Sequence, residues 1–308
     1  MGQSHSKSGV TFTQVHEHTA QQIPLDPTKH GVNHDCARID ILREDLAIAC
    51  VTDGAGQLYW SEVASRLLIR FFVEELIEII KQHEDDVKEG PAETFLYDAV
   101  VRANQRVLDY RMPDTNAKAN IFDDGGGQTT LVGSILFHEN NKWKLATVCT
   151  GDSLAYIYNT VDGSFQQITQ NEGFMLPFHG LSTNGLPAVV LATIEPDRDI
   201  VVIVSDGVYD IFPDKKIPPI PLQSPGADEL KDAIVAAVQS QFSETRGDPD
   251  DVTVVTLKLE KKNSEKNRTS TEVYPRTLSI PDITHTLFPE FKISMKLPWN
   301  EEYSYPPT

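Results

Sequence analysis

The chain has 308 residues, of which 40% are hydrophobic and 23% charged, an ordinary globular composition with enough apolar residues for a sizeable core. Its formal net charge of −18 disfavours binding to nucleic acid and to anionic membrane surfaces, because both need basic residues. The three cysteines have no CxxC spacing, and no apolar run is long enough to cross a membrane. We therefore expect a monomeric, cytoplasmic protein without disulfides.

The two ends of the chain differ from its middle. The first residues match the N-myristoylation pattern, with Gly2 as the acceptor, so peripheral membrane attachment through one reversible acyl anchor is an alternative to a purely cytoplasmic location. Residues 1–29 are otherwise polar and are expected to form a lead-in or an edge strand before a domain at 30–260. Residues 261–308 are rich in Pro, Ser and Thr, with aromatic residues near the end, and are expected to form a separate tail.

In chain order, the first strong pattern is a strand and the next two are helices. Leu46–Gly54 (LAIACVTDG) has the continuous apolar run of a buried strand. Apolar residues at helical spacing predict a helix over Ser61–His83, with Ser61 as its N-cap. A second helix follows Pro91, a favourable first-turn residue, and continues to about Tyr110.

The rest of the domain is predicted to contain five further strands and a third helix. The strands are expected near Thr129–Phe137, Trp143–Thr150, Leu154–Asn159, Ile200–Gly207 and Asp250–Leu257, and the helix over Ala227–Phe242. Turn signals around the first three strands favour an antiparallel meander. This mixture of long helices and adjacent strands favours a mixed α/β sandwich over a parallel doubly wound sheet.

Four of the apolar runs end or begin at an aspartate, namely Asp53, Asp152, Asp206 and Asp250. A carboxylate at the tip of a buried strand is costly to desolvate unless positive charge meets it. A single Asp-Gly after a strand is usually a turn, but four such acids suggest hard divalent cations with oxygen ligands. Two cations that share a bridging carboxylate can hold a phosphoryl oxygen and activate water, and Asp53-Gly54 suits that position because glycine lets the backbone come close.

Five motifs in the same order resemble those of the metal-dependent (type 2C) serine/threonine protein phosphatases. They are Val51–Gly56 (VTDGAG), Gly127–Thr130 (GQTT), Gly151–Tyr156 (GDSLAY), Ser205–Asp210 (SDGVYD) and Asp250–Val254 (DDVTV). The resemblance covers about residues 30–259. It implies a four-layer α-β-β-α sandwich of two antiparallel sheets flanked by helices.

The resemblance also implies an activity and a metal centre. The activity is hydrolysis of phosphoserine and phosphothreonine in phosphoprotein substrates by metal-activated water, with two Mn²⁺ or Mg²⁺ ions. Asp53 would bridge both ions and the Gly54 carbonyl would bind one of them. Asp206 and Asp250 would complete the other, and Asp152 would help to hold a third, weaker ion.

The first motif of the family is altered in this chain. His30 stands where the family has an arginine that contacts phosphate, and His34 stands at the usual Glu or Gln, while the following Asp35 is retained. We expect His30 to contact phosphate, although imidazole lacks the bidentate fork of guanidinium. We expect His34 and Asp35 to ligate the metals, with His34 binding a metal or its water, although imidazole is a softer ligand for Mg²⁺ than carboxylate. Ala55 occupies the place of a histidine that some members carry as a proposed general acid.

Two further expectations concern the type of phosphatase. The stretch between Asp152 and Asp206 is short and has no basic, glycine-rich flap, which resembles the compact subgroup of the family. The altered first motif and the aromatic tail leave an alternative open, a weak or inactive pseudophosphatase that uses the fold as a binding scaffold.

Overall fold

In the computed structural model, the structure describes residues 10–20, 34–56, 58, 60–83, 87–110, 122, 126–186, 188–245 and 250–261. All of these residues belong to one compact unit, residues 1–263. The predicted sites at Gly2 and His30 lie outside the described residues, as does the tail 262–308.

The described strands form two five-stranded sheets in which all neighbouring strands are antiparallel. The first sheet has the order β1 (Val10–Ala20), β10 (Val252–Lys261), β9 (Asp199–Val204), β6 (Leu154–Asn159) and β7 (Phe165–Gln167). The second has the order β2 (Asp35–Arg43), β3 (Leu46–Asp53), β4 (Leu131–Glu139), β5 (Lys142–Thr150) and β8 (Val190–Ile194). Strand β1 is therefore the edge strand that we considered for the N-terminal stretch.

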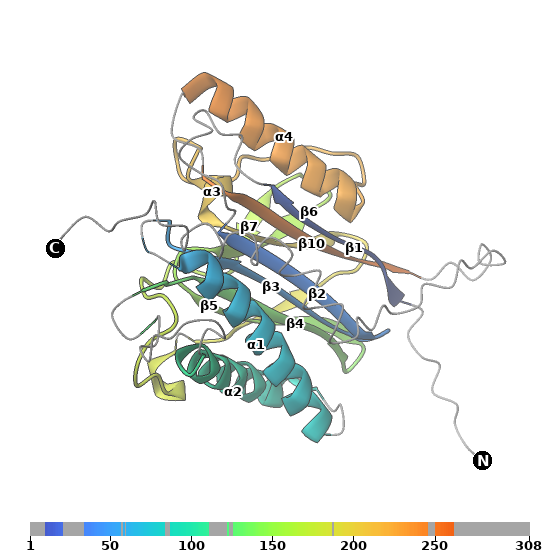
Figure 1. Ribbon diagram of the computed structural model, residues 1–308. Coiled ribbons are helices and arrows are strands. Elements are labelled where there is room, and N and C mark those ends of the chain that lie inside the picture. The colour runs from blue at the N-terminus through green and yellow to red at the C-terminus, as the bar shows by residue number, and fades with distance from the viewer. Residues whose placement is uncertain are drawn as a thin grey trace, which may run out of the picture. The chain divides into compact units, whose positions relative to one another are not determined.

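Helices cover the outer face of each sheet (Figure 1). Helices α1 (Ser61–Gln82) and α2 (Glu89–Leu108) pack together and against the β2–β5 side, and α4 (Ala227–Thr245) packs on β10 and β1. The short elements are α3 (Asp206–Tyr209), which follows β9, and the 3₁₀ turn η1 (Thr183–Gly185). These four layers confirm the expected α-β-β-α sandwich.

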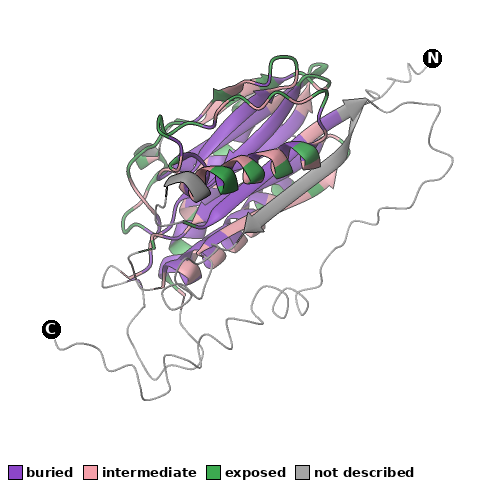
Figure 2. Cartoon of the chain, turned by 90° about the horizontal axis from the view of Figure 1, so that it is seen from above, coloured by how far each residue is buried: buried purple, intermediate pink, exposed green. Residues whose placement is uncertain are grey.

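The packing explains why the strand sequences are apolar without alternation. On β9, Val201 and Ile203 pack between the two sheets, while Ile200, Val202 and Val204 pack towards α3 and α4. Figure 2 shows the strands largely buried and the exposed residues of α4 on its outer side. Full burial of each Val or Ile stabilises the fold by about 1.5–3 kcal/mol, so β9 is a rigid support for the residues that follow it.

The predicted three-strand meander is wrong at its third strand. Strands β4 and β5 pair with each other, but β6 pairs with β7 and β9 in the other sheet. The chain crosses between the sheets at Gly151, which has a φ of +80° and whose added Cβ would lie 2.6 Å from the Thr130 Cγ2 atom. Apolar periodicity indicates that a segment is a strand but not which sheet it joins.

The predicted helices are present, with differences at their ends. Ser61 is the first residue of α1 and not its N-cap, because Trp60 with a φ of 71° precedes the helix and the Ser61 hydroxyl donates to the Leu58 carbonyl. Helix α2 begins two residues before Pro91, and α4 continues to Thr245. No helix in the described part of the chain is long and apolar enough to span a bilayer.

Candidate functional site

The strand register brings three of the four predicted acids to the same end of three neighbouring strands in the first sheet. Val204, at the end of β9, pairs with Leu154 at the start of β6 and with Val254 near the start of β10. Asp206 follows β9, whereas Asp152 precedes β6 and Asp250 precedes β10. The antiparallel pairing therefore gathers carboxylates that are far apart in the sequence.

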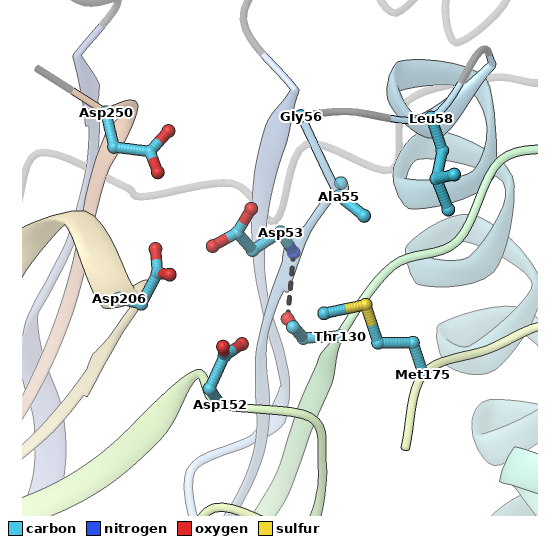
Figure 3. A pocket seen from close by; sticks show the side chains of 10 residues that line it. Asp53, Ala55, Gly56, Leu58, Thr130, Asp152, Met175, Asp206 and Asp250 are labelled. Atoms are coloured by element: carbon cyan, nitrogen blue, oxygen red, sulfur yellow. Dashed lines mark hydrogen bonds between the residues drawn. The ribbon is translucent and has the colours of Figure 1, made fainter. Parts of the chain in front are cut away.

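The fourth acid, Asp53, reaches the same place from the second sheet. It ends β3 and lies with the other three on a pocket of about 320 Å³. Figure 3 shows the four carboxylates pointing into a common space. The residues that line the pocket are Asp53, Gly54, Ala55, Gly56, Leu58, Thr130, Asp152, Met175, Asp206 and Asp250. None of these described lining residues is basic.

Three hydrogen bonds fix the backbone of Asp53. Its carbonyl accepts from the Thr130 amide at 2.8 Å and from the Thr129 hydroxyl at 2.8 Å. Its amide donates to the Thr130 hydroxyl at 3.0 Å, the bond drawn in Figure 3. The carboxylate thus projects from a main chain that is held by the start of the neighbouring strand.

Gly54 is required by a close backbone approach. A Cβ atom added there would lie 2.6 Å from the Ser61 carbonyl oxygen and 3.1 Å from the His34 carbonyl oxygen. Both neighbours are main-chain atoms, which cannot move aside as a flexible side chain can. Only glycine brings the chain after Asp53 this close to the start of α1, while the assignment of the Gly54 carbonyl to a metal stays a prediction.

The carboxylates are electrostatically unfavourable to one another. Burial, followed by the charges of Asp35 and Asp206, raises the pKa of Asp53 well above its ordinary value. Burial likewise raises the pKa of Asp206 to about 6, with smaller contributions from the charges of Asp250 and Asp152. The pKa of Asp152 is also raised, first by burial and then by neighbouring acids.

Asp35 and His34 lie beside the pocket but are not among the residues that line it. Asp35 is only 3% exposed and stands opposite Asp53 in the β2–β3 register, and burial raises its pKa to about 7. The main chain of His34 joins elements, since its amide donates to the Asp251 carboxylate at 2.7 Å and its carbonyl accepts from the Ser65 hydroxyl at 2.5 Å. Their assignment to the metal centre stays a prediction.

Sequence analysis missed the segment that forms one wall of the pocket. Leu176 pairs through its backbone with Thr129 at 2.7 and 2.9 Å, and this places Met175 on the pocket. Asn104, a buried polar residue of α2, accepts from the Phe178 amide at 2.7 Å and donates to the Phe178 carbonyl at 3.0 Å. An asparagine on the apolar face of a predicted helix was the one signal for this contact.

The donor set suits Mg²⁺ or Mn²⁺, which prefer carboxylate and carbonyl oxygens. One Asp206 carboxylate oxygen is buried and has no hydrogen-bond donor among the described residues, as expected of an atom reserved for a cation. No three His, Cys, Asp or Glu side chains of the described residues converge closely enough to hold an ion by themselves. Waters or phosphate oxygens would complete the coordination, which is usual for Mg²⁺.

Comparisons with known proteins give a consistent picture of the fold. No protein-family model and no curated protein sequence matches the chain. The solved structures that it resembles include the serine/threonine phosphatase Stp1 from Staphylococcus aureus, with 17% identity, a TM-score of 0.55 and coverage of 84% of this chain and 100% of that one. Serine-threonine phosphatase 2C from Toxoplasma gondii has 13% identity, a TM-score of 0.55 and coverage of 81% and 97%.

A third similar structure contains metal. It is the catalytic domain of the serine threonine protein phosphatase PstP in complex with two manganese ions, with 18% identity, a TM-score of 0.50 and coverage of 81% of this chain and 99% of that one. At such low identities the likeness concerns architecture and does not carry over activity. The chain has the fold of the type 2C serine/threonine phosphatases.

Proposed function

We propose that the chain is a metal-dependent protein phosphatase that hydrolyses phosphoserine and phosphothreonine. One observation carries the proposal: four carboxylates line one pocket, and none of the described residues that line it is basic. Such a pocket repels a phosphate group unless cations lie between them. The motifs that carry these acids are those of the type 2C phosphatases, and the fold agrees with them.

The proposed roles are those that the family resemblance implies for the acids that line the pocket. Asp53 would bridge two ions, the Gly54 carbonyl would bind one of them, Asp206 and Asp250 would complete the other, and Asp152 would help to hold a third. Two Mn²⁺ or Mg²⁺ ions would neutralise the phosphate charge and lower the pKa of a bound water.

The family resemblance implies direct attack of water on phosphorus without a phosphoenzyme. None of the described lining residues is Ser, Cys or His, and the four carboxylates, a side-chain type that can form an aspartyl-phosphate, are assigned to the cations. The Thr130 hydroxyl is occupied, because it accepts from the Asp53 amide and shares a hydrogen bond of 2.6 Å with the Ser153 hydroxyl.

Three residues of the altered first motif and its surroundings are assigned by resemblance. His30 would contact the phosphate, and Asp35 and His34 would contribute to the metal centre as ligands. Since Ala55 replaces the histidine of some family members, protonation of the leaving group would fall to water or another side chain. The short stretch before Asp206 supports the compact subgroup.

The test is phosphate release from a phosphoserine peptide with Mn²⁺, comparing the wild type with Asp206→Asn. We expect metal-dependent turnover that falls by at least about 10²-fold in the variant. The control is Asp45→Asn, because Asp45 carries a comparable charge paired with Arg43 and does not line the pocket. Equal rates for wild type and Asp206→Asn, or turnover that does not depend on added metal, would refute the proposal.

The alternative function, a binding scaffold without catalysis, is favoured by His30 and His34 in place of the family residues. Calorimetric titration with Mn²⁺ separates the two. Tight binding of two ions without turnover, even after His30→Arg, would support the scaffold.

Membrane attachment through an acylated Gly2 is a separate proposal. An unchanged distribution of Gly2→Ala between soluble and membrane fractions would argue against acylation.

A further inference from the structure

One partly buried hydrogen bond links two of the acidic segments directly. The Tyr209 hydroxyl donates to the main-chain carbonyl of Asp152 at 2.6 Å, across 57 residues of sequence. Tyr209 is the last residue of α3, the short helix that begins at Asp206, and it is 6% exposed. The bond therefore ties the segment that carries Asp206 to the segment that carries Asp152.

Asp152 needs such support because of where it lies. It stands on the crossing from β5, in one sheet, to β6, in the other. On its C-terminal side, the Ser153 hydroxyl shares a hydrogen bond of 2.6 Å with the Thr130 hydroxyl, which also accepts from the Asp53 amide at 3.0 Å. Asp152 is thus held towards Asp206 through Tyr209 and towards Asp53 through Ser153.

Repulsion between the carboxylates explains why the hydrogen bonds of Tyr209 and Ser153 matter. The four carboxylates face a common space (Figure 3), and like charges at short range in a partly buried pocket push the segments that carry them apart. The hydrogen bond from the Tyr209 hydroxyl to the main-chain carbonyl of Asp152 resists that movement while leaving the Asp152 carboxylate available to the pocket. Phenylalanine in place of Tyr209 would fill the same space but could not donate a hydrogen bond.

We propose that Tyr209 is a positioning residue whose hydroxyl sets the separation of Asp152 from Asp206 and thereby the affinity of the pocket for divalent cations. This inference rests on the proposed function only in assuming that the pocket binds such cations. It does not depend on phosphatase turnover.

The chain offers a matched control for Tyr209→Phe. The Tyr158 hydroxyl, on β6, also donates to a backbone carbonyl at 2.6 Å, that of Ile220, and Tyr158 does not line the pocket. Tyr158→Phe therefore removes the same kind of bond from a buried tyrosine elsewhere. Comparable melting temperatures of the two variants would show that both remain folded to the same extent.

The experiment is a calorimetric titration of each full-length protein with Mn²⁺ at neutral pH, with free Mn²⁺ measured in parallel by electron paramagnetic resonance. We expect Tyr209→Phe to weaken the lowest-affinity Mn²⁺ site by about 10-fold, the range typical of supporting residues around metal ligands. Tyr158→Phe should bind Mn²⁺ within about 2-fold of the wild type, since loss of a remote hydrogen bond does not alter the ligands.

A double variant tests whether the effect passes through Asp152. If it does, Tyr209→Phe will weaken Mn²⁺ binding no further in an Asp152→Ala background. Wild-type Mn²⁺ affinity in Tyr209→Phe, equal losses in both tyrosine variants, or a full additional loss in the double variant would each overturn the inference. Metal binding by the wild type without phosphopeptide turnover would instead refute the proposed function and leave this inference standing.

Discussion

Asparagine in place of Asp206 should stabilise the metal-free protein while weakening its stabilisation by metal. Burial and the charges around it raise the pKa of Asp206 from 3.8 to about 6. This difference of about two pKa units, at about 1.4 kcal/mol each, means that ionising Asp206 lowers the stability of the folded state by about 3 kcal/mol near pH 8. Because the repulsion is distributed over several neighbouring acids, we expect Asp206→Asn to raise the free energy of unfolding of the metal-free protein by about 1–3 kcal/mol.

The pH dependence fixes the sign of this prediction. A carboxyl whose pKa is raised by folding stabilises the folded state below the unfolded value of 3.8, and that stability is lost as the pH rises through about 6. The advantage of Asp206→Asn should therefore be greatest at pH 8 and should shrink steadily as the pH falls towards 4.

The assay is thermal and urea unfolding in EDTA at pH 8 and pH 4.5, repeated with excess Mn²⁺. In a domain of this size, about 1–3 kcal/mol corresponds to a rise in melting temperature of roughly 2–12 °C. Added Mn²⁺ should stabilise the wild type more than the variant, so the difference in melting temperature between them should shrink or change sign. Asp45→Asn, at an exposed ion pair with Arg43, should change stability by no more than about 0.5 kcal/mol. A metal-free Asp206→Asn that is less stable than the wild type at pH 8 would refute the electrostatic argument.

Three other predictions concern the same end of the molecule. Gly54→Ala should lower the free energy of unfolding in urea by about 1–3 kcal/mol, because the new Cβ would lie 2.6 Å from a main-chain oxygen at the start of α1. Gly185→Ala, whose Cβ would have no atom within 4 Å, should have little effect. Calorimetric Mn²⁺ affinity should rise from pH 5.5 to pH 7.5, since protons held by Asp206, with its pKa of about 6, and its neighbours compete with the metal. Asn104→Ala should cost about 1–3 kcal/mol and speed proteolysis near Phe178, because it removes both main-chain hydrogen bonds that hold that residue.

Much of the fold could be predicted because its signals are local. Helices α1, α2 and α4 have helical spacing of apolar residues, and β3 and β9 have uninterrupted apolar runs that only burial on both faces explains. The four pocket acids were found because each follows or precedes such a run. The structure brings all four to one pocket.

The features that were missed depend on contacts between distant segments. Nothing in the sequence of β6 distinguishes a third meander strand from a strand of the other sheet, because both would be apolar and equally short. The bond from Tyr209 to the Asp152 carbonyl and the clamp of Asn104 on Phe178 join residues 57 and 74 positions apart, and neither leaves a periodic pattern. The prediction of Ser61 as the N-cap of α1 was wrong because Trp60 adopts a left-handed conformation that its residue type does not predict.

The rigidity of the sandwich is what would let the acidic cluster act as the proposed cation site. Strand β9 is buried along its whole length, and the main chain of Asp53 is held by three hydrogen bonds, so neither Asp206 nor Asp53 can retreat when the carboxylates ionise. In a flexible loop the same charges would separate and turn to solvent. Here the repulsion persists in the folded state and is relieved only by protons or by cations. In the proposed function, the charges that lower the stability of the free protein would therefore raise its affinity for divalent metal, and at neutral pH, where protons are scarce, metal would displace protons from the carboxylates.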